Sequence, residues 1–368
     1  MAFSRASLSF ISETLHVSRV AVLLNGGGTL RLAYAVGYSP APQLEIPADS
    51  PDVEKTAREE MGAELILPLS LNRKVLGLLS LGPKRSEEPY SKADVRLLGS
   101  VATQTGMALE NSRLTAEIAA EIARRERMNR ELEIAREVQE RLFPQELPEV
   151  AGLDYSGTCR PALGVGGDYF DFLLLPNNML GIAIGDVSGK GIAAALLMAG
   201  LRASLRGQTI DGAHNLAGLM NNVNKLVYES SSSNRYATFF YAQFDPSTRI
   251  LAYVNGGHNP PLVFRKTGKL MRLEAGGPVV GLLPTFGYEQ AFVTLEPGDV
   301  LVAFTDGISE AMNSADEEWG EERLVETVRQ LGDRPAKEIV SGLIEAADRF
   351  VAGAKQHDDM TLIVARVS

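Results

Sequence analysis

The sequence predicts an α+β protein with a small sensor-like domain in front of a larger sandwich of sheets and helices. A length of 368 residues suits two domains better than one. A charged, helix-prone stretch without glycine or proline, residues 115–141, separates two regions of regular apolar patterning. After residue 153, hairpin-spaced strands alternate with paired helices, which favours a sandwich over a parallel doubly wound sheet.

The first region, residues 1–114, predicts an α+β sensor-like sheet. Ser91 and Asp94 form a capping signal that opens a long helix with apolar positions on one face. Glycines at 26–28 indicate a turn between the first two strands, and residues 72–74 indicate a hairpin loop between the last two. The predicted strands are 19–24, 30–35, 65–70 and 75–81.

The second region, residues 115–143, predicts a helical linker. Three polar residues, Glu121, Arg125 and Gln139, interrupt its apolar seam, so a two-stranded coiled coil and a solvated connecting helix are both open interpretations. We expect a homodimer through this helix. Pro144 and Pro148 end the helix and mark the entrance to the third region, residues 144–368. The seam positions are Leu114, Ile118, Met128, Leu132, Ala135 and Leu142.

Composition restricts the class of function. The net charge of −10, without a basic block, argues against non-specific nucleic-acid binding. Cys159 is the only cysteine, so an intrachain disulfide is excluded. The N-terminus does not resemble a signal peptide, and the longest apolar run, 192–201, is about half the length of a membrane-spanning helix. We therefore expect a cytoplasmic protein without a membrane partner.

The third region carries four acidic clusters beside glycines or at predicted strand ends. They contain Asp168 and Asp171, Asp186, Asp306, and the pair Asp358 and Asp359. Rigidly held carboxylates of this kind suit hard cations such as Mg²⁺ or Mn²⁺. Several aspartates gathered together repel one another unless cations neutralise them. The predicted strands are 180–184, 236–244, 251–255, 262–265, 300–305 and 361–367, and the predicted helices are 191–205, 213–228, 322–331 and 336–352.

Residues 185–191 form a glycine loop between a strand and a helix, whose N-terminus is a candidate anion site. The loop is not a Walker A motif, because the spacing differs and Lys190 precedes glycine rather than serine or threonine. No Rossmann glycine motif follows a strand either.

These motifs give the chain a specific resemblance. Residues from about 133 to 367 resemble the SpoIIE-like branch of the PPM-type, protein phosphatase 2C-like, metal-dependent phosphatases. Residues 1–114 are similar to a GAF domain, most clearly in 75–81 and in the helix that ends at 108–111. The matching elements stand in the family order: residues 135–144, 167–171, 185–191, 255–261, 305–307 and 358–361.

The resemblance implies a pair of packed antiparallel sheets flanked by helices, with two divalent cations, Mn²⁺ or Mg²⁺, at one end. Asp168, Asp186, the Val187 carbonyl, Asp306 and Asp358 match the family's metal ligands. The four aspartates are the candidate catalytic residues, because they would act through a metal-activated water.

Supporting roles follow from the same resemblance. Asp171 and Asp359 are expected to orient the site without binding metal, and His258 is expected to stabilise a turn. The arginine that binds phosphate in the animal enzymes has no counterpart here, so Lys190 or the helix amides are candidates for that contact.

The implied activity is hydrolysis of phosphoserine or phosphothreonine on a phosphorylated anti-sigma-factor antagonist, controlled by the GAF domain through the linker. Two alternatives remain open: a catalytically inactive partner-switching scaffold, and a GAF-based small-molecule sensor. A purely dimerising GAF domain and one with a small-molecule ligand are equally compatible with residues 1–114.

Overall fold

The computed structural model describes residues 5–71, 74–209, 215–231 and 235–368, and it divides the chain into two compact units, Met1–Arg127 and Met128–Ser368. The predicted hairpin loop at 72–74 and the predicted helix start at 213 fall partly outside the described residues. The finer boundaries at 114 and 143 stay a prediction.

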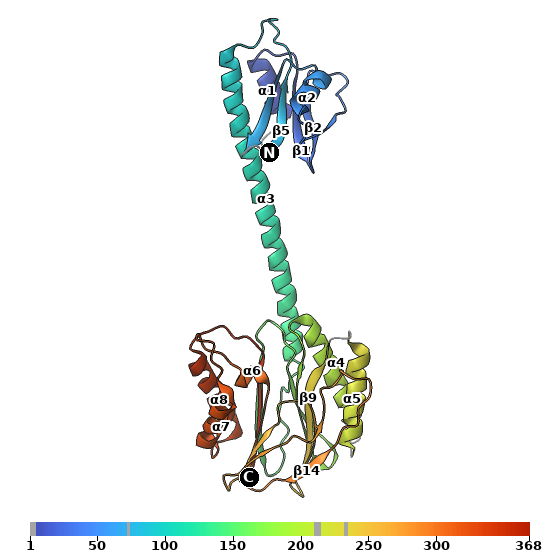
Figure 1. The fold of residues 1–368 in the computed structure, drawn as a ribbon, viewed down its shortest axis with the longest axis vertical. Coiled ribbons are helices and arrows are strands. Elements are labelled where there is room, and N and C mark those ends of the chain that lie inside the picture. Colours follow the sequence, from blue (N-terminus) through green and yellow to red (C-terminus); the bar gives the residue numbers. More distant parts are fainter. Residues whose placement is uncertain (1–4, 72–73, 210–214, 232–234) are drawn as a thin grey trace. The chain divides into compact units, whose positions relative to one another are not determined.

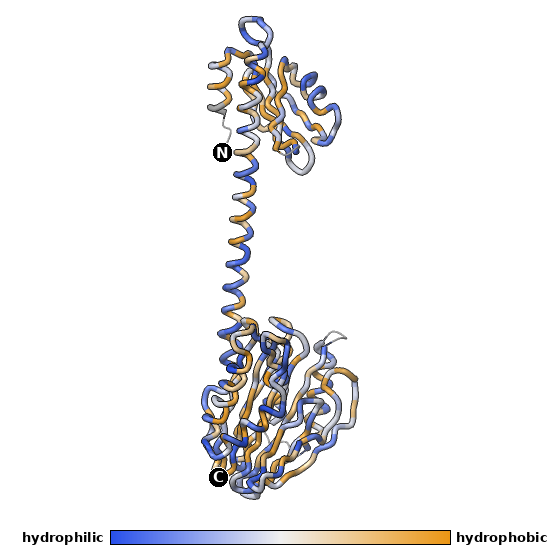
Figure 2. The backbone as a smooth tube through the Cα atoms, turned by 60° about the vertical axis from the view of Figure 1, so that its left-hand side comes forward, coloured by the Kyte–Doolittle hydropathy of each residue, from blue (hydrophilic) through white to orange (hydrophobic). Residues whose placement is uncertain are grey.

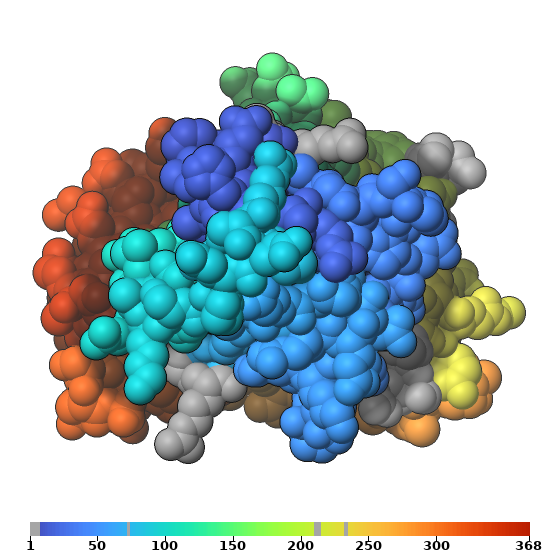
Figure 3. All heavy atoms as spheres, turned by 90° about the horizontal axis from the view of Figure 1, so that it is seen from above, coloured from blue at the N-terminus to red at the C-terminus, as the bar shows by residue number. Residues whose placement is uncertain are grey.

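The N-terminal unit is a five-stranded antiparallel sheet with helices on both faces (Figure 1). α2 covers one face through Val53, Ala57 and Met61, and α1 covers the other together with the first turns of α3. The space-filling view shows α1 beside the start of α3 (Figure 3, dark blue and cyan). The strand order is β3-β2-β1-β5-β4. The elements are α1 (Arg5–Thr14), β1 (Val20–Gly26), β2 (Thr29–Val36), β3 (Glu45–Pro47), α2 (Val53–Met61), β4 (Leu65–Leu71), β5 (Lys74–Leu81) and α3 (Lys92–Glu140).

The capping signal at the start of α3 is confirmed. The Ser91 hydroxyl accepts the Asp94 N–H at 3.2 Å, and the Asp94 carboxylate accepts the Ser91 N–H at 2.9 Å. This reciprocal pair satisfies donors that a helix N-terminus leaves free. From there α3 runs unbroken to Glu140. Within the described residues, no helix is long and apolar enough to cross a membrane.

The C-terminal unit is a sandwich of two sheets (Figure 1). One sheet has the order β13-β10-β9-β8-β7, with β14 paired to β10, and the other has the order β12-β11-β15-β16-β6. All pairs are antiparallel except the short parallel pair of β10 and β13. The first elements are β6 (Leu153–Arg160), β7 (Tyr169–Leu174), η1 (Pro176–Asn178), β8 (Leu180–Val187), α4 (Ile192–Thr209), α5 (Leu216–Ser230), β9 (Ala237–Asp245) and β10 (Ile250–Gly256). The others are β11 (Leu262–Phe264), β12 (Leu270–Arg272), β13 (Gly276–Gly277), β14 (Ala291–Thr294), β15 (Val300–Phe304), α6 (Asp306–Ser309), α7 (Gly320–Leu331), α8 (Ala336–Val351) and β16 (Met360–Val367).

Three apolar layers hold the sandwich together. Phe240 and Ile363 lie in the layer between the sheets, Met198 lies between the first sheet and α4 and α5, and Leu343 lies between the second sheet and α7 and α8. Each fully buried side chain of this size stabilises the fold by about 1.5–3 kcal/mol. The arrangement confirms the predicted α+β class. Because the three layers between sheets and helices are apolar, the polar site residues lie where the strands end.

Candidate active site

The candidate site lies at one edge of the sandwich, where strands of both sheets end. On the first sheet, Asp168 precedes β7 and Asp186 is the second-last residue of β8, and these two strands pair antiparallel. On the second sheet, Asp306 begins α6 two residues after the end of β15, and Asp358 lies two residues before β16, which pairs with β15. The topology therefore gathers four acidic positions that are far apart in the sequence.

Asp186 lies within the strand ladder rather than after it. The predicted strand ended at 184, but β8 continues to Val187 and pairs Asp186 with Thr238 of β9. The backbone of β9 approaches Gly185 closely: a Cβ atom at residue 185 would lie only 2.6 Å from the Thr238 carbonyl oxygen. Glycine at this position therefore allows the strand to continue. The longer ladder fixes the backbone of Asp186 and of Val187.

Two threonines connect the sheets through Asp168. The hydroxyls of Thr305 and Thr361 both donate to Asp168 Oδ2, at 2.8 and 2.5 Å, and all three side chains are buried. Thr361 belongs to β16 of the second sheet and Thr305 directly follows β15 of that sheet, whereas Asp168 leads into the first. The two bonds therefore hold the Asp168 carboxylate in one orientation.

Asp359 holds the loop that carries Asp168. One carboxylate oxygen of Asp359 accepts the Gly167 N–H at 2.8 Å, and the other accepts the Ala162 N–H at 2.7 Å. A Cβ atom at Gly166 would collide with this carboxylate, so the close approach requires glycine. Asp359 thus supports the loop, in the manner expected of a residue that orients the site.

The acidic side chains interact electrostatically. The pKa of Asp186 is raised to about 7, first by burial and then by Asp306, Asp358 and Asp359. The pKa of Asp168 is raised well above its usual range by burial and by Asp186, and that of Asp306 by burial and by Asp358. These carboxylates therefore repel one another, and a nearby positive charge would stabilise their ionised forms.

The donor atoms fit a hard divalent cation, because they are carboxylate oxygens, and the Val187 carbonyl oxygen lies against Gly167 together with the Asp186 carboxylate. Across the described ranges, no three histidine, cysteine, aspartate or glutamate side chains are close enough together to hold one metal ion as they stand. Lys190 supplies a positive charge beside the aspartates. Its ammonium lies 2.9 Å from Asp358 Oδ2 and also donates to the His357 carbonyl oxygen.

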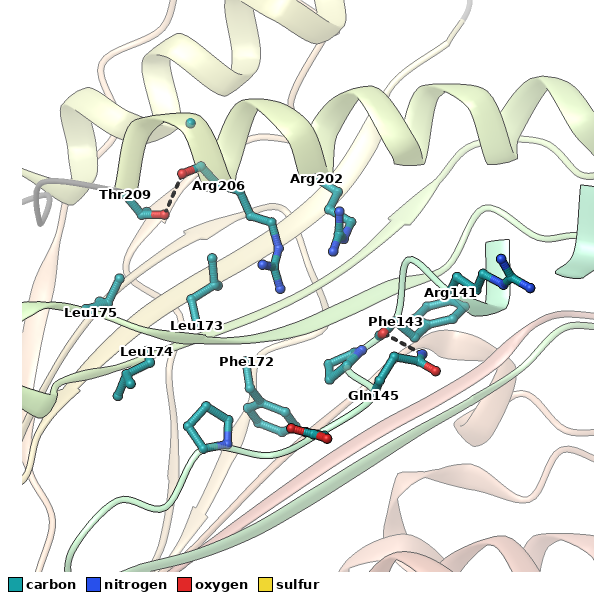
Figure 4. Close-up of a pocket in the computed structure, with 14 residues that line it drawn as sticks. Arg141, Phe143, Gln145, Phe172, Leu173, Leu174, Leu175, Arg202, Arg206 and Thr209 are labelled. Carbon is teal, nitrogen blue, oxygen red and sulfur yellow. Dashed lines mark hydrogen bonds between the residues drawn. The ribbon is translucent and has the colours of Figure 1, made fainter. Parts of the chain in front are cut away.

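The structure places Asp171 apart from this cluster. Its carboxylate is fully buried and forms two bonds with the Arg206 guanidinium, at 2.7 and 2.8 Å, while Arg202 lies 3.6 Å away. Both arginines belong to α4 and line a hollow of about 660 Å³ over β7 (Figure 4). Asp171 therefore anchors the C-terminal half of α4 to β7.

Sequence reasoning missed Gln139, which it treated only as an interruption of the helical seam. Gln139 is buried, and its amide makes both possible bonds with Gly166. It donates to the carbonyl oxygen at 2.7 Å and accepts the N–H at 3.0 Å. The end of α3 is therefore bonded to the loop before Asp168. A glutamine in an apolar seam was the available signal.

His258 stabilises a turn next to the site. The Asn255 side chain accepts the His258 N–H at 2.7 Å and donates to its carbonyl oxygen, and the ring bonds to the Thr238 hydroxyl. Burial lowers the pKa of His258 to about 4, so the ring is neutral at pH 7. These contacts are those of a structural residue.

Comparison with known proteins agrees with this geometry. Residues 176–368 match the model of the stage II sporulation protein E (SpoIIE) family, and residues 3–111 match a GAF domain model. The phosphoserine phosphatase RsbU of Bacillus subtilis (strain 168) is 31% identical over 316 residues, which cover 85% of this chain and 89% of RsbU. Protein IcfG of Synechocystis sp. is 30% identical over 260 residues, but the chain spans only 41% of its length.

The solved SiaA-PP2C domain of Pseudomonas aeruginosa has the same fold. It aligns with a TM-score of 0.60 at 18% identity and covers 67% of this chain and 99% of that domain. The predicted SpoIIE-like and GAF resemblances are thus confirmed, as is the predicted sandwich. The chain belongs to the SpoIIE family and joins a PP2C-type serine phosphatase domain to an N-terminal GAF domain.

Proposed function

We propose that the protein is a metal-dependent serine/threonine protein phosphatase whose partner substrate is a phosphorylated anti-sigma-factor antagonist. The observation that carries the proposal is the gathering of Asp168, Asp186, Asp306 and Asp358 at one sandwich edge. The relation to the phosphoserine phosphatase RsbU supports the reaction, and the resemblance to the SpoIIE-like branch supports the substrate class.

These four carboxylates and the Val187 carbonyl would hold two divalent cations, Mn²⁺ or Mg²⁺. Bound cations of this kind lower the pKa of a water molecule and polarise a phosphoryl group. The chain's own residues orient the donors: Thr305 and Thr361 fix Asp168, and Asp359 fixes its loop.

Lys190 is the candidate for contact with the substrate phosphate. Its side chain is 44% exposed and its present partner is Asp358. Once a cation neutralises Asp358, the Lys190 ammonium would be available to form an ion pair with the substrate phosphate. The N-terminal amides of α4 begin two residues later and favour negative charge at the same place.

Metal removal tests the proposal. Hydrolysis of a phosphoserine peptide should fall at least a hundredfold in excess chelator and return with Mn²⁺ or Mg²⁺, because the clustered carboxylates need cations to act together. Phosphate release is the measurement. Full turnover in excess chelator would refute the two-cation mechanism, whereas no turnover with either metal would favour the inactive scaffold.

Regulation would run through α3. We assign residues 1–114 to the sensor, 115–143 to the linker and 144–368 to the catalytic domain, and we propose a homodimer through the linker. Hydrophobic residues are spaced along the mainly hydrophilic middle of α3 (Figure 2), and among them the side chains of Ile118 and Met128 are 60% and 50% exposed. A second copy of the helix would cover them.

A lysine at Ile118 should therefore make the protein monomeric and lower its turnover several-fold. Leu132 is a poorer test position, because it lies over Gly164 of its own catalytic unit. Ile122 is 53% exposed but lies outside the seam, so Ile122→Lys is the matched control and should stay dimeric. Light scattering gives the mass, and phosphate release gives the activity. A monomeric Ile118→Lys protein with unchanged turnover would show that the helix is only a tether.

A further inference from the structure

A second hollow, of about 290 Å³, opens beside the aspartate cluster. Gly307 and Asp358 both line it. Asp358 is a predicted metal ligand, and Gly307 directly follows another, Asp306. The hollow is therefore continuous with the place where the proposed reaction would occur. Its apolar lining consists of Ala311, Met312, Val351, Ala354 and Met360.

The walls of this hollow are held in place by bonds between distant segments. The Arg160 guanidinium forms two bonds with Asp348 of α8, at 2.9 and 2.7 Å. The Gln356 amide donates to the carbonyl oxygens of Arg160 and Asp358, at 2.8 and 2.7 Å. β6, α8 and the segment before β16 thus form a preformed pocket, which suits a binding role.

Glu310 gives the pocket its charge. Among the described residues its carboxylate has no ion-pair partner, whereas Arg160 and Asp348 neutralise each other. Burial raises the pKa of Glu310, and so do the neighbouring carboxylates of Asp306, Glu318 and Asp358, of which Glu318 is not a predicted metal ligand. Lys355 also lines the pocket, and both its side chain and that of Glu310 are exposed. A positive charge is the complement that Glu310 lacks.

We propose that this pocket binds a lysine or arginine side chain that flanks the phosphorylated residue of the substrate protein. The apolar lining would contact the methylene stem, and Glu310 would accept a charge-assisted hydrogen bond from its tip. The pocket thereby selects among phosphorylated sites. This inference rests on the proposed phosphatase function, because it assumes that the phosphate lies at the aspartate cluster.

The test uses full-length protein with Mn²⁺ and a set of phosphoserine peptides in an alanine background. A single lysine is moved through the three positions on either side of phosphoserine. One position should raise kcat/KM about tenfold over the all-alanine peptide, mainly through KM. Glu310→Gln should reduce the ratio of kcat/KM for the lysine peptide to kcat/KM for the all-alanine peptide to about one. Glu310→Lys should bring the same ratio below one. Glu322→Gln, an exposed change on α7, should keep the wild-type ratio.

Hydrolysis of p-nitrophenyl phosphate tests the phosphatase function separately from the pocket, since this ester has no lysine or arginine side chain that could bind there. If wild-type protein hydrolyses neither this ester nor any peptide, the phosphatase proposal fails and the pocket proposal fails with it. If it hydrolyses them but shows no lysine preference, or if Glu310→Lys keeps that preference, only the pocket proposal is overturned.

Discussion

Asp186→Asn is expected to lower turnover by about 10³-fold, a loss of roughly 4 kcal/mol of transition-state stabilisation. The change keeps the shape of the side chain but removes a charged donor from the centre of the aspartate cluster. Asp306→Asn should have a similar effect, because it removes the charge of another of the four carboxylates proposed to hold the cations. Phosphate release at saturating Mn²⁺ is the measurement.

The same change should not destabilise the metal-free fold. The raised pKa of Asp186 means that its ionised form is disfavoured in the folded protein, so at pH 8 and in chelator the neutral amide relieves repulsion. We expect a melting temperature a few degrees above that of the wild type, about 2–4 °C. Asp333→Asn, an exposed change of the same chemistry, should alter neither quantity. A variant at Asp186 with near wild-type turnover would contradict its assignment as a ligand.

Much of the fold could be predicted because local patterns agreed with the final packing. The apolar run that forms β8 and the glycine loop before α4 lie in one continuous segment of the chain. The capping residues Ser91 and Asp94 are only three residues apart. Strand-end aspartates could be recognised as site candidates for the same reason. Such signals need no knowledge of the tertiary structure.

The elements that were missed lack a local signal. β6 has a mixed polar sequence and is held mainly by its pairing with β16, more than two hundred residues later for most pairs. β12 and β13 have only three and two residues, too few for an apolar alternation to show. Their existence depends on neighbouring strands, which a sequence pattern does not reveal.

The supporting residues of the site were missed for a similar reason. Thr361 is an ordinary strand residue and Thr305 an ordinary residue after a strand, until the pairing of β15 with β16 brings both hydroxyls to Asp168. Arg206 is one of the two arginines on α4 until it meets Asp171. The carboxylates could be identified from the sequence, but the groups that orient them are defined by contacts between distant segments.

Gln139→Ala is the second change with a large expected effect. It would leave the Gly166 N–H and carbonyl unpaired in a buried position, which costs about 1–3 kcal/mol for such a group. The loop before Asp168 would then be free to move from its position. Because a displacement of about 1 Å can lower a rate by roughly a hundredfold, we expect turnover to fall 10- to 100-fold.

The measurement that separates positioning from general instability is a Mn²⁺ titration of activity, with thermal unfolding of each variant in parallel. Gln139→Ala should need more Mn²⁺ for half-maximal activity, since the Gly166 loop leads directly to the donor Asp168. Glu137→Ala, on the solvent-exposed side of the same helix, should behave as wild type. If Gln139→Ala keeps both its turnover and its Mn²⁺ midpoint, the end of α3 does not position the site, and control through the linker would have to reach the aspartates by another route.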